Sequence, residues 1–243
     1  MFKASSTNLR HMVFAFLSDD DLAISLLKSL EEHYELILFG GVVRDYVVSS
    51  SIAPRDIDIV LVGANKYLLE IERNAYFKDR IRRNSFGGFK IFCESSVFDI
   101  WNINDTWAFK EKLVEPSIEN LLRTVYLNID AYAYSLTKQV FIDNCNSRKL
   151  PATIDIVLQQ NPNLLLNFIR AFALSRKYQI EFSDNFKRAI IREIHNANSS
   201  GSFISALIKE QERHLNETAV TLSEISELVT EIQELELELM SKC

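Results

Sequence analysis

Residues 38–62 read LFGGVVRDYVVSSSIAPRDIDIVLV, a stretch in which a glycine pair and a carboxylate pair each lie beside an apolar run. Gly40 and Gly41 predict a turn out of one strand, and Asp56 and Asp58 lie in a second predicted strand. Residues two apart on a strand share a face, so these two carboxylates are expected to project together. Neighbouring carboxylates repel unless a cation lies between them, and magnesium prefers oxygen ligands. The pattern predicts a metal-dependent phosphoryl or nucleotidyl transfer.

The same stretch resembles the head of the nucleotidyltransferases of the DNA polymerase beta superfamily. It is most similar to the bacterial poly(A) polymerase and CCA-adding tRNA nucleotidyltransferase class, which has a Gly-Gly-x-Val-Arg-Asp turn followed by an Asp-x-Asp strand. The matching residues are Gly40, Gly41, Val43, Arg44, Asp45, Asp56 and Asp58. Each motif is common alone, but the two together between apolar runs are specific. The resemblance covers roughly residues 36–181.

The resemblance implies that Asp56, Asp58 and Asp99 are the catalytic residues and hold one or two Mg²⁺ ions. One ion would lower the pKa of an attacking hydroxyl, and the other would neutralise the phosphates of the leaving pyrophosphate. Asp99 lies in the run FDIWNIND, where the family keeps its third acidic residue, and is also a candidate general base. A surface-facing aspartate on an alternating strand is the alternative for Asp99.

A nucleotide site is expected around the glycine turn. Gly40 and Gly41 have no Cβ, so the backbone can approach a triphosphate closely. The helix predicted after them presents its N-terminus, which suits phosphate, and Arg44 is expected to add a charge-assisted phosphate contact. Asp45 is expected to pair with an arginine or cap the helix rather than touch metal.

A second family motif, Arg-Arg-Asp-Phe-Thr-Ile-Asn-Ala-x-Ala-Tyr, is only partly present in residues 124–134, which read TVYLNIDAYAY. Its leading Arg-Arg-Asp is replaced by Thr-Val-Tyr, and the adjacent Arg123 is expected to take over a phosphate or ribose contact. Asp130 replaces the asparagine. For Asp130, a ribose or metal role and a capping or core-anchoring role both remain open.

The base-selecting motif of CCA-adding enzymes, Glu-Asp-x-x-Arg, is lost from residues 159–182, which read QQNPNLLLNFIRAFALSRKYQIEF. Asn161 stands in place of its aspartate and Leu164 in place of its arginine. Leucine cannot hydrogen-bond the Watson–Crick edge of a base. Arg170 does match a later helix arginine and is a predicted nucleotide contact. Programmed CCA addition is therefore not expected.

The order of elements predicts an α+β fold: a small mixed sheet of the nucleotidyltransferase type with helices on one face, followed by a helical C-terminal part. We expect a catalytic head over residues 1–143, a helical neck-like region over 144–200 and an acidic C-terminal helix over 201–243. Apolar residues recur at helical spacing in residues 117–136, and a further helix is predicted over 152–160.

Four local patterns in the sheet region are also informative. Asp56 and Asp58 fall in a strand expected over residues 55–62, and Asp20 lies in an N-cap signal for a helix expected from residue 21. Four basic residues cluster nearby, and they face either a phosphate or solvent at a strand edge: Lys78, Arg80, Arg82 and Arg83. Three aromatic residues follow Asp99, for which core packing is favoured over stacking on a base: Trp101, Trp107 and Phe109.

The C-terminal stretch is acidic, with nine glutamates and three basic residues over positions 201–243. Its apolar residues form a short heptad seam at Leu222, Ile225, Val229 and Ile232. This seam predicts a terminal helix packed on the body, or a modest dimer or partner contact.

Composition limits the class of protein. The chain has 243 residues, is 47% hydrophobic and carries a net charge of −6, which argues against a strongly basic nucleic-acid binder. No apolar run is long enough to span a bilayer, so no membrane partner is expected. The N-terminus does not resemble a secretion signal. The three cysteines are far apart and lack metal-ligand spacing, which predicts a reduced, cytoplasmic protein: Cys93, Cys145 and Cys243.

Two functions follow. The first is a magnesium-dependent nucleotidyltransferase that moves NMP from an NTP to a hydroxyl of RNA, protein or a small molecule; RNA is favoured because the resemblance is to RNA enzymes. The alternative is a catalytically silent module, such as a toxin–antitoxin or defence component, that binds nucleotide or a partner chain. Loss of the second-motif arginines favours the silent module, whereas retention of three carboxylates argues against it, because buried acids without a cation are costly.

Overall fold

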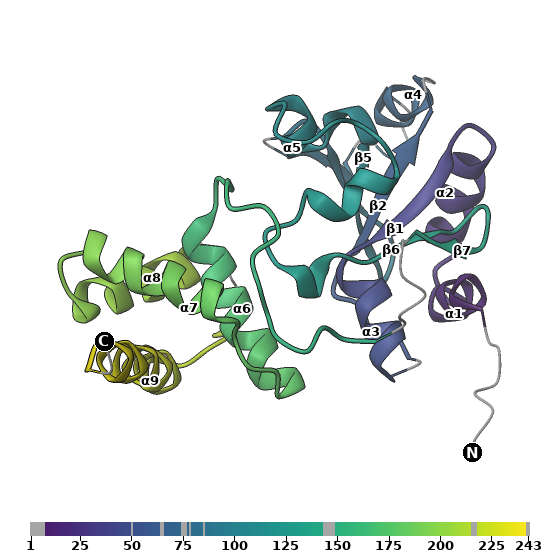
Figure 1. Ribbon diagram of the computed structural model, residues 1–243. Helices are drawn as coiled ribbons and strands as arrows, with labels where there is room; N and C mark the ends of the chain where they lie inside the picture. The colour runs from purple at the N-terminus through teal and green to yellow at the C-terminus, as the bar shows by residue number, and fades with distance from the viewer. Residues whose placement is uncertain are drawn as a thin grey trace, which may run out of the picture. The chain divides into compact units, whose positions relative to one another are not determined.

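The structure is a computed structural model, and it describes most of the chain. The described backbone comprises residues 8–49, 51–63, 66–73, 77, 79–84, 86–142, 149–214 and 218–241, with side chains as far as residue 234. The chain divides into two compact units, one formed by residues 1–125 and 130–150 and the other by 126–129 and 151–243 (Figure 1). Among the described helices, none is long and apolar enough to cross a membrane.

The first unit is built on a mixed sheet with the strand order β3-β4-β5-β2-β1-β6-β7. The strands are β1 (Glu35–Phe39), β2 (Ile57–Val62), β3 (Ile81–Arg83), β4 (Phe89–Phe92), β5 (Val97–Asn102), β6 (Ala133–Ser135) and β7 (Val140–Phe141). The central pair β2 and β5 is parallel, and the other neighbouring pairs are antiparallel. The predicted mixed sheet is confirmed, although β2 begins at Ile57 rather than at residue 55.

One face of the sheet carries the longer helices of this unit, as the fold prediction expects: α1 (Leu9–Phe16), α2 (Asp21–Glu31), α3 (Gly41–Ser49) and α4 (Tyr67–Arg73). Alternate strand residues point toward them, for example Ile57 and Ile59 of β2 and Phe98 of β5, which are almost fully buried. Burying one such side chain contributes about 1.5–3 kcal/mol to the free energy of unfolding. This apolar layer therefore determines which face of each strand points to the interior.

The opposite face has a thinner cover. It consists of the turn η1 (Ile103–Asp105), α5 (Trp107–Lys110) and the 3-10 segment η2 (Glu119–Arg123). Phe109 and Leu121 pack there against Ile37 of β1 and Val60 of β2. Because side chains alternate, Asp58 lies on this same thinly covered face, two residues before Val60.

The second unit is helical, with α6 (Leu164–Tyr178), α7 (Asp184–Asn196), α8 (Ser200–His214) and α9 (Leu222–Ser241). An aromatic cluster forms its core: Phe168 contacts Phe186 and Phe203 edge-on, and Phe172 and Phe182 extend the cluster. The helical C-terminal part predicted from the sequence is confirmed.

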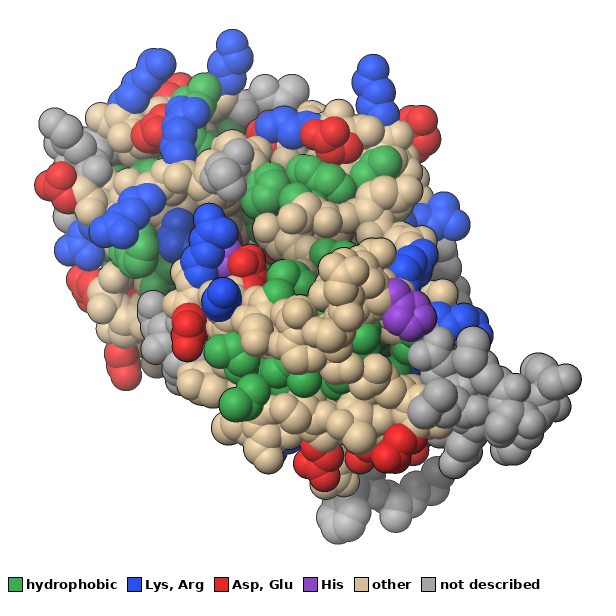
Figure 2. Space-filling view, turned by 90° about the vertical axis from the view of Figure 1, so that its left-hand side faces the viewer, with side chains coloured by type: hydrophobic (Ala, Val, Ile, Leu, Met, Phe, Trp, Pro, Cys, Tyr) green, Lys and Arg blue, Asp and Glu red, His purple; other side chains and the backbone are tan. Residues whose placement is uncertain are grey.

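Both signs of charge occur on the face that Figure 2 shows. Blue Lys and Arg side chains lie mainly over the upper part of this view, with red Asp and Glu side chains among them and along the lower edge. Outside its acidic C-terminal stretch, the chain has 24 basic and 24 acidic residues.

The helix predicted over residues 152–160 is wrong. This segment is irregular, and its backbone instead forms isolated β-bridges with residues far away in sequence: Ile154 with Phe182, and Ile156 with Leu127. Residues 117–136 likewise contain only η2, a turn η3 (Asn128–Asp130) and β6, although their apolar residues recur at helical spacing. Pairing with chain far away in sequence outweighs the local periodicity in both places.

The C-terminal stretch for which one acidic helix is predicted contains two helices, α8 and α9. Gln211 of α8 holds the chain before α9 through two 2.9 Å hydrogen bonds, donating to the carbonyl of Val220 and accepting from its N–H. Three residues of the predicted heptad seam are buried inside this unit: Ile225, Val229 and Ile232. The seam therefore packs on the body of the unit, and a dimer or partner contact stays a prediction.

Asp20 ties α2 to the turn between β4 and β5. It caps α2 by accepting from the N–H of Ala23 at 3.0 Å. It also accepts from the N–H groups of Ser95 at 2.9 Å and Ser96 at 3.0 Å, and from the Ser96 hydroxyl at 2.7 Å. Burial alone would raise the pKa of Asp20, but these hydrogen bonds lower it to about 2. The predicted N-cap is confirmed. The same side chain also joins α2 to the turn between β4 and β5.

Replacing Asp20 by asparagine is expected to destabilise the protein by about 1–3 kcal/mol, because the amide donors then meet backbone donors in a buried place. The folded pKa of Asp20 is depressed, so its contribution is present above about pH 4 and is lost as the pH falls toward 2. Urea unfolding of wild type and D20N between pH 2 and 6 measures this.

The neighbouring exposed Asp19 supplies the control, and Asp19→Asn is expected to change the free energy of unfolding by less than about 0.5 kcal/mol. An equal loss in D19N and D20N, or a gap between wild type and D20N that does not narrow below pH 4, would contradict the assignment.

Candidate active site

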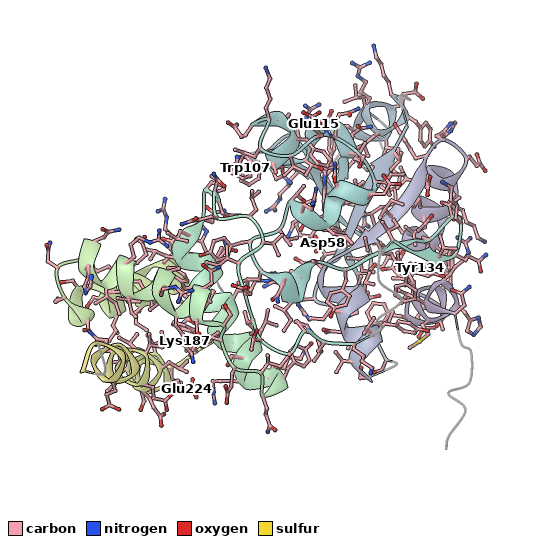
Figure 3. The ribbon with its side chains drawn as sticks, viewed as in Figure 1. Asp58, Trp107, Glu115, Tyr134, Lys187 and Glu224 are labelled. Carbon is pink, nitrogen blue, oxygen red and sulfur yellow. The ribbon has the colours of Figure 1, made fainter. Side chains whose placement is uncertain are left out.

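Asp58 and Asp99 lie side by side on the thinly covered face of the sheet. They are register partners on the parallel strands β2 and β5. Lys90 is in turn the register partner of Asp99 across the antiparallel pair β4 and β5. Register partners share a face, so these three side chains form a row across neighbouring strands (Figure 3 marks Asp58). The structure thus brings together two of the three predicted catalytic residues.

Asp56 lies next to this row, in the bend that precedes β2 rather than in the strand. Its Oδ2 atom is 3.2 Å from Nη2 of Arg55 and 3.6 Å from Nζ of Lys90. Its side chain keeps 22% of its surface exposed, so the carboxylate remains accessible from solvent. All three predicted carboxylates therefore lie in one neighbourhood.

The ammonium group of Lys90 lies between two of these carboxylates. Its Nζ atom is 3.0 Å from Oδ2 of Asp99, as well as within reach of Asp56. Burial would lower the pKa of Lys90, but the hydrogen bond and the negative charges raise it, so the lysine is charged. Burial raises the pKa of Asp99, against the opposing effect of Lys90.

Sequence reasoning missed Lys90. The signal that points to it is its alternation with Phe89 and Ile91, which places it on the polar face of its strand. The register between β4 and β5 was needed to place it opposite Asp99.

The glycine turn meets this row at Asp58. Gly40 has φ +66°, a left-handed conformation that glycine adopts without strain, and a Cβ added there would lie 3.8 Å from Oδ2 of Asp58. The N–H of Gly40 donates to the carbonyl of Tyr132 at 2.8 Å, and its carbonyl accepts from the N–H of Arg44 at 3.0 Å. The turn therefore holds the N-terminus of α3 beside a carboxylate of the site.

Arg44 is buried among carboxylates rather than extended toward solvent. Its Nη1 atom donates to Asp130 at 2.6 Å, and its Nη2 atom is 3.0 Å from Asp45, with 7% of the side chain exposed. These contacts support the anchoring interpretation of Asp130 and the predicted pairing of Asp45. A phosphate contact of Arg44 and a ribose or metal role of Asp130 stay predictions.

The remaining predicted nucleotide contacts are exposed. Arg123 ends η2 in the first unit, and Arg170 lies on α6 in the second, so their roles stay predictions. Asn161, which stands at the lost base-selecting aspartate, accepts from Asn167 at 2.7 Å and from the N–H of Asn163 at 3.0 Å. Both contacts join the side-chain oxygen of Asn161 to residues at the N-terminus of α6.

Trp101 and Phe109 pack in the core, as the sequence favours, whereas a core role of Trp107 stays a prediction. Trp101 donates to the Thr106 hydroxyl at 3.1 Å and meets Phe39 edge-on. Phe109 is almost fully buried, with 5% exposed. The hairpin before β4 is held close to β5 as well, since a Cβ on Gly88 would lie 3.1 Å from the carbonyl oxygen of Ile100.

The predicted basic cluster lies at the edge strand β3, except for Lys78, which lies outside the described residues. Arg83 donates to Glu72 through two 2.6 Å hydrogen bonds, and the guanidinium of Arg82 lies 5.1 Å from the centre of the Phe92 ring. Both side chains are exposed and engaged locally, which supports the solvated-edge interpretation.

The side chains of this site could bind magnesium only together with other ligands. Within the described residues, no three His, Cys, Asp or Glu side chains converge closely enough to hold a metal ion. Lys90 supplies a reason, because an ammonium group already lies between Asp56 and Asp99. Magnesium in phosphate-transfer sites is usually bound by one or two carboxylates together with water and substrate phosphates. Adjacent aspartates beside a helix N-terminus fit that requirement.

The fold is similar to solved structures of tRNA-processing enzymes. A CCA-adding enzyme with ATP matches at a TM-score of 0.58 and 18% identity, covering 90% of this chain and 54% of that one. The Thermotoga maritima CCA-adding enzyme complexed with tRNA matches at 0.59 and 18%, covering 88% and 52%. A tRNA nucleotidyltransferase with a primer tRNA and an incoming ATP analog matches at 0.56 and 20%, covering 83% and 58%.

The resemblance predicted from the two motifs is thus confirmed at the level of fold. The chain spans about half the length of these enzymes. No family model and no curated protein matches the chain.

The buried ion pair between Arg44 and Asp130 is expected to stabilise the glycine turn. Arg44→Met leaves buried carboxylates without their partner and should lower the free energy of unfolding by about 3 kcal/mol. Combining R44M with Asp130→Asn should cost less than the two single changes added together, which a double-mutant cycle in urea measures.

Arg55→Met is the matched control, because the Arg55 side chain is 74% exposed and its ion pair is expected to contribute less than about 1 kcal/mol. Additive effects in the cycle, or an R44M variant as stable as R55M, would argue against an anchoring role for the buried pair.

Proposed function

We propose that the protein is a magnesium-dependent nucleotidyltransferase that moves NMP from an NTP to a hydroxyl acceptor. The observation that carries the proposal is the row of Asp58 and Asp99 on neighbouring parallel strands, beside the turn at Gly40. The fold likeness supports it, since the structures named above are complexes with ATP, with tRNA, and with a primer tRNA and an ATP analog.

In the proposed reaction, the acceptor oxygen forms a bond to the α-phosphorus while the bond to the pyrophosphate oxygen breaks. The N–H groups at the start of α3 receive the triphosphate, because a helix N-terminus favours anionic groups. Asp99 takes the proton of the acceptor hydroxyl. Magnesium, bound by one or two of Asp56, Asp58 and Asp99 together with water and the substrate phosphates, would supply charge neutralisation at the phosphates and a lower pKa of the hydroxyl.

An RNA 3′ end is the acceptor that the fold likeness favours, because structures of this fold are complexed with tRNA. Programmed CCA addition is not proposed. Leu164 begins α6 where the family resemblance places a base-reading arginine, and it has no hydrogen-bonding group for a base. The cytoplasm, predicted from the cysteine pattern, is the compartment in which RNA and NTP are both available.

The alternative is a silent module that binds nucleotide or a partner. Lys90 favours it, because its ammonium already neutralises Asp56 and Asp99 without a metal. Titration of magnesium-NTP by calorimetry against wild type and Asp58→Ala separates the two: a silent module binds NTP and transfers nothing to any acceptor.

Asp58→Asn is expected to lower NMP transfer at least about 100-fold, because the loss of several kcal/mol of charge stabilisation corresponds to that factor. The assay is incubation with each labelled NTP, magnesium and total RNA, with label followed into RNA and into protein. Asp105→Asn is the control, since Asp105 is a partly exposed aspartate of the same unit paired with Lys110. Absence of label from both RNA and protein with wild type would count against the enzyme.

A further inference from the structure

Lys90 occupies the place where a cation shared by Asp56 and Asp99 would lie. Its ammonium is 3.0 Å from one carboxylate and 3.6 Å from the other, and the backbone register holds its Cα opposite that of Asp99. The side chain leaves the apolar layer, because its neighbours Phe89 and Ile91 face the other side of the sheet. Packing against the core therefore does not account for the position of Lys90.

We propose that Lys90 is a tethered cation that competes with the divalent metal for Asp56 and Asp99. Like charges exclude one another, so an ammonium and a magnesium ion cannot both lie between these carboxylates. Without metal, Lys90 neutralises the pair and removes the cost of neighbouring negative charges. With metal, it gives up these contacts. The inference rests on the proposed function for the identity of the metal ligands.

The lysine side chain has the freedom that this exchange requires. It carries a compact charge on a flexible four-carbon stem, and 36% of its surface is exposed, so its head can move into water. An arginine at this position would engage a carboxylate with two parallel hydrogen bonds and would be harder to displace. The site therefore binds metal more weakly than its carboxylates alone would, and becomes fully loaded only at a high concentration of divalent cation.

Metal affinity of Lys90 variants tests the competition directly. Mn²⁺ binding to the full chain without nucleotide is followed by the electron paramagnetic resonance signal of free Mn²⁺. Lys90→Met is expected to bind at least about tenfold more tightly than wild type, because a positive charge beside a carboxylate lowers its affinity for a proton by about one to three orders of magnitude and opposes a metal ion in the same sense. Lys90→Arg keeps the charge and is expected to bind no more tightly than wild type.

Lys110→Met is the matched control. Lys110 also pairs with an aspartate of the same unit, at 2.9 Å from Asp105, but lies outside the row of carboxylates. Its loss is expected to leave Mn²⁺ affinity unchanged. Affinity of K90M equal to or weaker than that of wild type overturns the proposal, as does absence of Mn²⁺ binding from both proteins.

A second measurement needs no variant and so does not depend on the folding of K90M. Lysines of the wild-type protein are acetylated with an activated ester, with and without saturating Mg²⁺, and each site is quantified by mass spectrometry. Mg²⁺ should raise the labelling rate of Lys90 several-fold and leave that of Lys110 unchanged. A Lys90 rate that Mg²⁺ does not raise overturns the proposal.

These outcomes are separable from those of the transfer assay. Tighter Mn²⁺ binding by K90M, in a protein that moves no NMP, supports the competition and rejects the enzyme. NMP transfer by wild type, with equal Mn²⁺ affinity of K90M and wild type, supports the enzyme and rejects the competition.

Discussion

The parallel pairing of β2 with β5 is the constraint on which the site depends. Parallel neighbours cannot be joined by a tight hairpin, so the chain leaves β2, forms α4, β3 and β4, and returns before β5 begins. This return brings Asp99 beside Asp58 in register and places β4 on the outer side of β5. The apolar layer under α1–α4 then forces the remaining alternate residues of all three strands onto the other face. Asp58, Asp99 and Lys90 lie on this other face, which the short segments η1, α5 and η2 cover.

Three groups of half-buried or buried acids in this unit are compensated in different ways. Asp20 receives backbone N–H groups and hydroxyls, and Asp130 receives the buried guanidinium of Arg44. Both arrangements are enclosed, so they act as structure. Asp56 and Asp99 instead share the flexible, partly exposed Lys90. Of these three arrangements, only the last combines concentrated negative charge with access from solvent, which is what a divalent metal ion requires.

The fold likeness and the local chemistry bear on function in different ways. The likeness to CCA-adding enzymes extends over nearly the whole chain but over about half of theirs, and it concerns the scaffold. The base-reading positions Asn161 and Leu164 argue for a different use of that scaffold, whereas the glycine turn and the carboxylate row argue for retained phosphate chemistry. In the proposed competition, an active and a silent site differ at Lys90, because its ammonium group and a metal ion would exclude one another from Asp56 and Asp99.

The sequence by itself determined the features whose causes are local. The strand–glycine turn–helix unit around Gly40, the cap at Asp20 and the alternation that puts Asp58 opposite the core all follow from residues a few positions apart. Only the tertiary structure decided the features that depend on pairing between distant segments. Residues 152–160 do not form a helix, because their backbone forms bridges with Leu127 and Phe182 instead. Lys90 reaches the acidic pair through a strand register that its own neighbours do not encode, because hydrogen bonds between separate strands, not the periodicity within one, set which side chains meet.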